Sequence, residues 1–60
     1  MTTISYNGEE FDFAKAEAAM DPDLRQTVLE RISPCSEQEL LDAYAAAHLA
    51  IFGDEFYIPE

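Results

Sequence analysis

The 60-residue chain carries 13 Asp and Glu against 3 Lys and Arg, a formal net charge of −10. A chain of this length forms one domain at most, and a hydrophobic content of 48% predicts that residues 1–60 fold as a single small domain. The excess of acid excludes direct binding to nucleic acid or to an anionic membrane surface. It predicts partners with basic surfaces, such as proteins that themselves bind nucleic acid.

The composition also limits localisation and cofactor chemistry. Cys35 is the single cysteine, so an internal disulfide and a cysteine-based zinc site are excluded. The polar start of the chain shows no signal peptide, and no apolar run approaches the roughly 18 residues of a membrane span. We therefore expect a soluble cytoplasmic protein with no cofactor and no metal.

The first element is predicted to be a β-hairpin. Residues 2–6 alternate and are rich in β-forming types, and Asn7-Gly8 after them is the strongest short signal for a type I′ turn. A two-residue loop sets the register, with Ser5 opposite Glu10 and Thr3 opposite Asp12. The apolar side chains then share the face expected in the core: Ile4, Tyr6, Phe11 and Phe13.

Two short helices should follow the hairpin. Asp12 has the chemistry of an N-cap for a helix over about residues 13–20, whose apolar stripe includes Ala16 and Met20. Asp21-Pro22 then supplies a second cap and a proline at the first helical position. This second helix should run to about Arg31, with its apolar residues at helical spacing: Leu24, Val28, Leu29 and Ile32.

The third predicted helix spans about residues 37–52. Ser36 and Glu39 form a capping box, and Gly53 is placed to end the helix. We expect Cys35 before the cap to pack on Leu40 as a hydrophobic staple. The predicted apolar stripe consists of Leu40, Leu41, Tyr44, Ala47, His48, Ile51 and Phe52. If Phe52 is buried, its replacement by Ala should cost about 3–5 kcal/mol.

Residues 54–58 alternate between polar and apolar side chains and are predicted to form a third strand that ends at Pro59. The predicted fold class is α+β. A three-stranded antiparallel sheet, made of the N-terminal hairpin plus the C-terminal strand, should pack against three helices.

Catalysis is not expected, because no constellation of reactive residues is present. His48 could act as a general base or ligand, but its place on an apolar stripe favours a core histidine with a hydrogen-bond partner. Cys35 could be a nucleophile at a helix N-terminus, but the simpler interpretation is that it is a small apolar residue of the hydrophobic staple. Asp21 and Asp23 lack the rest of a calcium loop and are explained by helix capping. We predict that the protein is not an enzyme.

The acidic residues are unevenly distributed. All three bases lie within residues 15–31, so the hairpin, the third helix and the C-terminal strand carry uncompensated acid. A net charge of −10 exceeds the roughly 2–8 that solubility alone requires in a small domain. Spaced carboxylates resemble a phosphate backbone and could occupy a Lys- and Arg-lined groove. The predicted partner-binding residues are Glu10, Asp12, Glu37, Asp42, Asp54 and Glu55.

The oligomeric state is predicted to be a monomer or a weak homodimer. A contact between two copies could form on a smooth outer side of the third helix, which we expect from its alanines: Ala43, Ala45, Ala46 and Ala50. The simpler explanation is that alanine favours helix.

Four stretches resemble a known group of proteins: Tyr6-Asn7-Gly8, Phe11-Asp12-Phe13, residues 38–44 and residues 52–56. With the length and acidity, they make the chain similar to phage and mobile-element anti-CRISPR proteins directed at type I surveillance complexes, type I-C among them. The resemblance implies an inhibitor in the host bacterial cell that binds a CRISPR effector subunit and blocks recognition of target DNA. An alternative is a small interaction or accessory module whose charge serves solubility.

Overall fold

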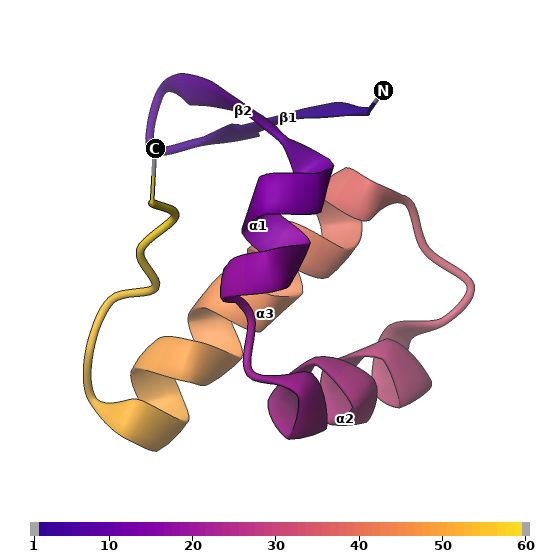
Figure 1. The fold of residues 1–60 in the computed structure, drawn as a ribbon. Coiled ribbons are helices and arrows are strands. Elements are labelled where there is room, and N and C mark those ends of the chain that lie inside the picture. The colour runs from indigo at the N-terminus through magenta and orange to yellow at the C-terminus, as the bar shows by residue number, and fades with distance from the viewer. Residues whose placement is uncertain (1, 60) are drawn as a thin grey trace.

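The computed structural model describes residues 2–59, and its elements follow one another with short connections (Figure 1). In chain order they are β1 (Thr3–Tyr6), β2 (Glu9–Asp12), α1 (Phe13–Ala19), α2 (Pro22–Ile32) and α3 (Glu37–Phe52). The hairpin lies over one end of the helical layer. The segment after α3 returns from the far end of that helix toward the hairpin turn. The predicted α+β class is confirmed.

Turn chemistry sets the hairpin as predicted. Asn7 and Gly8 have φ angles of 53° and 82°, the positive values that a type I′ turn demands. The strands pair antiparallel with Ser5 opposite Glu10 and Thr3 opposite Asp12. Ile4 is buried on the inner face, which confirms the predicted register and its consequence for the core.

The three helices begin at the predicted caps. The Asp12 and Asp21 carboxylates accept backbone hydrogen bonds at the starts of α1 and α2. Ser36 and Glu39 form both hydrogen bonds of a capping box at the start of α3, each 3.2 Å long. Gly53 ends α3 with a left-handed φ of 77°, a conformation that costs glycine little.

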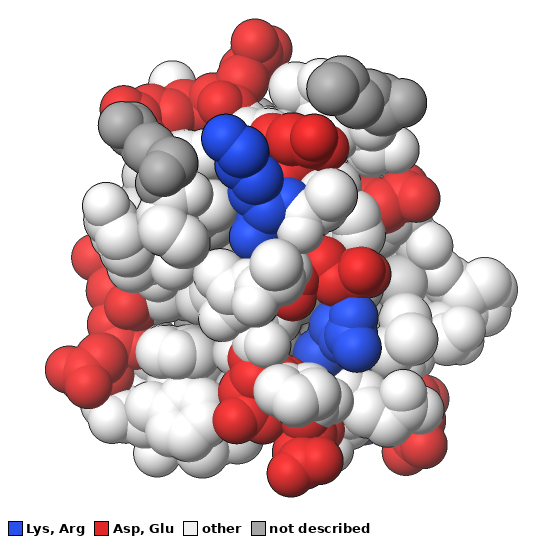
Figure 2. Space-filling model, viewed as in Figure 1, with Lys and Arg blue, Asp and Glu red and all other residues white. Residues whose placement is uncertain are grey.

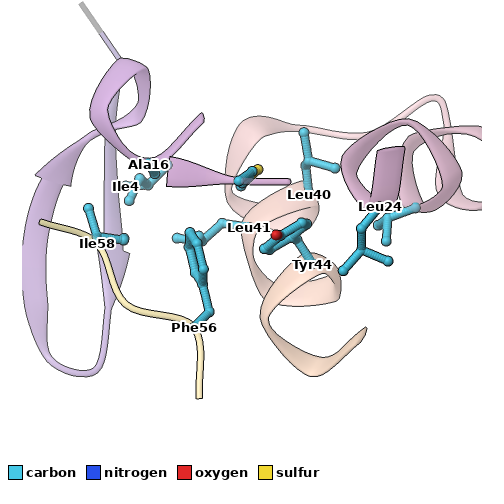
Figure 3. Packing of buried hydrophobic residues seen from close by; sticks show 10 residues of the cluster. Ile4, Ala16, Leu24, Leu40, Leu41, Tyr44, Phe56 and Ile58 are labelled. Atoms are coloured by element: carbon cyan, nitrogen blue, oxygen red, sulfur yellow. The ribbon is translucent and has the colours of Figure 1, made fainter. Parts of the chain in front are cut away.

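The core lies where the hairpin, the three helices and the C-terminal segment meet. Leu41 and Tyr44 of α3 are fully buried at its centre, between Phe56 on one side and Leu24 of α2 on the other (Figure 3). The buried residues are Ile4, Ala16, Met20, Leu24, Val28, Leu40, Leu41, Tyr44, Phe56 and Ile58. Every element except β2 contributes to this set, and Phe11 of β2 packs against it.

The predicted third strand is wrong. Within residues 2–59 the sheet has two strands, and residues 54–58 form no strand. The alternation itself is real, since Phe56 and Ile58 are each 3% exposed while Tyr57 is 74% exposed. Alternation reports that an extended segment is buried on one side, and it does not require a strand neighbour.

Side chains, in place of a backbone ladder, hold the C-terminal segment. The Tyr6 hydroxyl donates to the Phe56 carbonyl at 2.6 Å, and His48 Nδ1 lies 2.9 Å from the Asp54 carbonyl. At the outer edge of β1, the backbone N–H and C=O of Ser5 each bond to the side-chain amide of Gln38 at 2.8 Å. The Gln38 amide thus takes the backbone donor and acceptor of Ser5 to which an added strand would bond.

The predicted burial of Ile51 and Phe52 is also wrong. Ile51 is 64% exposed and Phe52 is 47% exposed, while Tyr44 of the same stripe is fully buried. His48 is half-buried. The last turn of α3 therefore continues the apolar periodicity of a core helix, but no neighbouring element covers it. Phe52→Ala is not expected to lower the free energy of unfolding by about 3–5 kcal/mol.

The contrast within α3 gives a stability test. Leu41→Ala should lower the free energy of unfolding by about 2–5 kcal/mol, because it opens a cavity at a fully buried position. Ile51→Ala, nearly three turns further along, should cost less than about 1 kcal/mol. Denaturant titration of both variants provides the comparison. Equal losses would contradict the assignment of the core to the first half of the helix.

A second test concerns the attachment of the C-terminal segment. Burial of Tyr6, and then the nearby Glu55 carboxylate, raise the pKa of this phenol above 10.0, while a hydrogen bond with Asn7 acts in the opposite direction. The folded protein thus holds the phenolic proton more tightly than the unfolded chain does. Its contribution to stability is complete below about pH 10 and is lost as the pH rises further.

Tyr6→Phe should therefore cost about 1 kcal/mol at neutral pH, from the lost bond to the Phe56 carbonyl. The difference in unfolding free energy between the variant and the parent should shrink above pH 10. Denaturant titrations at neutral and alkaline pH measure it. A difference that is constant with pH would show that Tyr6 ionisation is not linked to folding.

Candidate partner-binding surface

The six predicted partner-binding carboxylates all lie outside the core. Asp12 is half-buried and the other five are exposed. The structure places Glu10, Asp42 and Glu55 around Ser5 and the hairpin turn, Asp12 at the far end of β2, and Glu37 and Asp54 outside the hairpin. The grouping follows from specific contacts of β1 and the turn.

Asp42 of α3 is linked to the hairpin through one side chain. Gln38 binds the Ser5 backbone with its amide, and the same Nε2 donates to Asp42 Oδ1 at 3.1 Å. Across the ladder from Ser5 stands Glu10. A helix carboxylate, held by Gln38, and a strand carboxylate, placed by the register, therefore lie on either side of one β1 residue.

Glu55 reaches the other end of the hairpin. Asn7 Nδ2 in the turn donates to Glu55 Oε1 at 2.9 Å. Glu55 and Glu9 line the same open groove of about 260 Å³, which lies between the hairpin and the C-terminal segment. The hairpin rim is the name used below for the carboxylates grouped around Ser5, Tyr6 and Asn7: Glu9, Glu10, Asp42 and Glu55.

Glu9 was not among the predicted site residues. Its position opposite Tyr6 puts it on the inner side of the hairpin, at the end of the ladder nearest the turn. The register alone therefore suggested a residue directed toward the core. The exposure of Glu9 depends on the course of the C-terminal segment. Because that segment was predicted to form a paired strand, the sequence did not indicate that Glu9 would be exposed.

The remaining predicted carboxylates lie apart from the hairpin rim. Five residues separate Glu37 from Asp42, a rotation of roughly 140° around the helix. Glu37 lines a groove with Glu17 of α1. Asp54 lines another groove with Asp21 at the start of α2. Asp12 accepts a hydrogen bond from the Ala14 backbone at 3.3 Å, as an N-cap does.

The face formed by α1 and α2 has a different character. Figure 2 shows basic side chains in the middle of this face, with acidic ones around them. Arg25 Nη1 lies 3.3 Å from Glu17 Oε2, which is the one ion pair in the part of the chain that the structure describes. Charge compensation is thus local to these helices, as the distribution along the sequence predicts.

His48 has a structural contact that explains its position. A carbonyl oxygen can only accept, so the bond to Asp54 places a proton on Nδ1 of His48. The ring also packs edge-on against Phe52, with centroids 4.7 Å apart. The hydrogen-bond partner was predicted, whereas the predicted core position is wrong, since His48 is only half-buried. The bond links α3 to the C-terminal segment.

Cys35 is half-buried and packs against the core; it lines the same groove as Leu40 and Glu37. Its proximity to Leu40 agrees with the predicted hydrophobic staple. Among residues 2–59 no cluster of three His, Cys, Asp or Glu side chains could hold a metal ion. Over the same range, no helix has the length and apolarity needed to span a bilayer.

Three of the four alanines lie along one side of α3. Successive residues rotate by about 100°, so Ala43, Ala46 and Ala50 fall within roughly 60° of one another and Ala45 lies apart from them. Ala43 and Ala45 are half-buried and pack against the core, whereas Ala46 and Ala50 are exposed. The predicted smooth outer side therefore narrows to Ala46 and Ala50, and a contact between two copies there stays a prediction.

Comparison with known proteins identifies the family. The model of the anti-CRISPR protein AcrIC5 family matches residues 4–56, from β1 through α3 to the buried Phe56. No curated protein matches the chain. The match covers nearly all of the described fold and agrees with the resemblance to type I-C anti-CRISPR proteins. The chain belongs to the AcrIC5 family of anti-CRISPR proteins, inhibitors that act on a CRISPR–Cas complex.

Proposed function

We propose that this protein binds a type I CRISPR surveillance complex through an acidic surface that mimics DNA, and so blocks recognition of target DNA. Family membership supports the inhibitory role. The net charge of −10 supports the mechanism, because the surface of such a complex that binds DNA must itself be basic. The partner surface is then the DNA-binding groove of an effector subunit.

The observation that carries this proposal is how the hairpin rim is held. Asp42 accepts from the Gln38 amide and Glu55 from the Asn7 amide. Both donors are neutral, so each carboxylate is positioned without losing its negative charge. A lysine or arginine in the same place would have cancelled the charge, as Arg25 does for Glu17.

Positioned carboxylates bind a basic groove better than mobile ones. A side chain that is already held by a hydrogen bond loses less rotational freedom when it pairs with an arginine of the partner. The hairpin rim is therefore the proposed centre of the binding surface. Asp12, Glu37 and Asp54 are exposed or half-buried carboxylates on neighbouring parts of the molecule, and we place them at its periphery.

The proposal predicts the effect of removing charge alone. In the triple variant Glu10→Gln, Asp42→Asn and Glu55→Gln, the new amides at positions 42 and 55 can still accept the hydrogen bonds that held the carboxylates. Affinity for a type I-C surveillance complex should fall by about tenfold for each carboxylate that faces a base, and the salt dependence should flatten. Binding isotherms at two salt concentrations measure both effects.

Two controls make this test specific. Glu30→Gln on α2 removes one charge from the compensated region beside Arg31 and should change affinity little. Target DNA added as a competitor should displace the parent protein from the complex. Binding that ignores salt, together with simultaneous binding of DNA and inhibitor, would contradict DNA mimicry. The charge would then serve solubility and the protein would act as an interaction module.

Cys35 should be dispensable for inhibition. Its half-buried position beside Leu40 gives it a packing role, and no acid–base partner was evident in the sequence. Cys35→Ala should lower the free energy of unfolding by about 1 kcal/mol and leave inhibition of the complex intact. A folded Cys35→Ala protein without inhibitory activity would instead assign the thiol a direct role.

A further inference from the structure

The last turn of α3 exposes an uninterrupted run of apolar residues. Leu49, Ile51 and Phe52 are 54%, 64% and 47% exposed, and Ala50 between them is exposed as well. Phe52 packs on His48, but the core covers little of Leu49 and Ile51, and an exposed apolar run on a small acidic domain calls for a functional explanation. The name apolar tip is used below for Leu49–Phe52.

The apolar tip lies at the end of α3 that is far from the hairpin. In Figure 1 this end of the helix stands at the edge of the fold. Phe52 lines a groove there with Met20 and Asp21, while Leu49 and Ile51 are more than half exposed. Gly53 ends the helix directly after it, and Asp54 and Glu55 follow. The tip is therefore an exposed apolar helix end that two acidic residues follow directly.

We propose that the apolar tip is a second anchor for the CRISPR effector, which inserts into an apolar depression bordered by lysine or arginine. Protein interfaces commonly combine a desolvated apolar centre with a polar rim, and a few large side chains supply most of the affinity. Asp54 and Glu55 beside the tip require a basic border on the partner. This proposal rests on the proposed function for the identity of the partner.

Charge argues against a second copy as the occupant. Each molecule carries −10, and a contact between two tips would bring Asp54 and Glu55 of one copy near those of the other. A basic partner gains from the same residues. Glu55 follows the tip closely in the chain and bonds to Asn7 of the hairpin turn, so the segment that it belongs to connects the two regions.

The test separates apolar contact from charge. In the double variant Leu49→Gln and Ile51→Gln, both new residues favour helix and both sites are exposed, so folding should be preserved. Affinity for a type I-C surveillance complex should fall about thirtyfold or more, with the slope of log Kd against log salt unchanged. Ala18→Gln, at an exposed alanine on α1, is the matched control and should bind as the parent does.

The outcomes distinguish this proposal from the preceding one. If the double variant binds as tightly as the parent, the tip is not an anchor, whatever the charge variants show. If only the charge variants bind normally, the tip remains an anchor and DNA mimicry fails. Light scattering completes the test: a parent dimer that the double variant converts to monomer, with no change in affinity for the complex, would assign the tip to self-association and overturn the proposal.

Discussion

The fold depends on the environment of one side chain, Tyr44. Its ring is fully buried, lies 4.8 Å from Phe56 in an edge-on arrangement, and is 5.7 Å from His48. Its hydroxyl accepts the Asp21 backbone N–H at 2.7 Å. A single residue of α3 thereby contacts the C-terminal segment and the junction of α1 with α2, which a short chain with a small core needs. The course of the C-terminal segment, and hence the place of Glu55, follows from that packing.

The balance of charge separates the two sides of the molecule, although a neutral amide also holds Glu30 on α2. On α1 and α2 an arginine neutralises a glutamate, which stabilises the domain slightly and leaves a mixed surface. Around the hairpin, neutral amides hold Asp42 and Glu55 in place. The domain accepts the self-repulsion of a concentrated negative charge there, which is a cost in stability. Gln38 offsets part of that cost, because its amide bonds to the exposed backbone N–H and C=O of Ser5 in β1. The same amide positions Asp42, so one side chain serves both the fold and the acidic surface.

Local signals in the sequence were sufficient for the hairpin and the three helices, because Asn7-Gly8 and the capping residues act within a few positions of themselves. The third strand could not be predicted correctly, since the alternation at Phe56 and Ile58 describes burial on one side and is silent on pairing. The grouping of Glu10, Asp42 and Glu55 depends on Gln38 and Asn7 reaching across the fold. Such long-range side-chain contacts leave no periodic pattern in the sequence. The separation of Glu37 from Asp42, in contrast, follows from the rotation of about 100° per residue in a helix and was predictable.

The exposed end of α3 shows the same division between local and long-range effects. The helix continues to Phe52 because alanines favour it and Gly53 ends it, and both signals are local. Burial depends on the elements that pack against the helix, and after His48 the helix extends beyond them. The apolar stripe of α3 thus continues for one turn past the core. In that turn Phe52 packs on His48, whereas Leu49 and Ile51 are more than half exposed. The apolar anchor proposed above would account for these two side chains, because the length of the helix places them at its end.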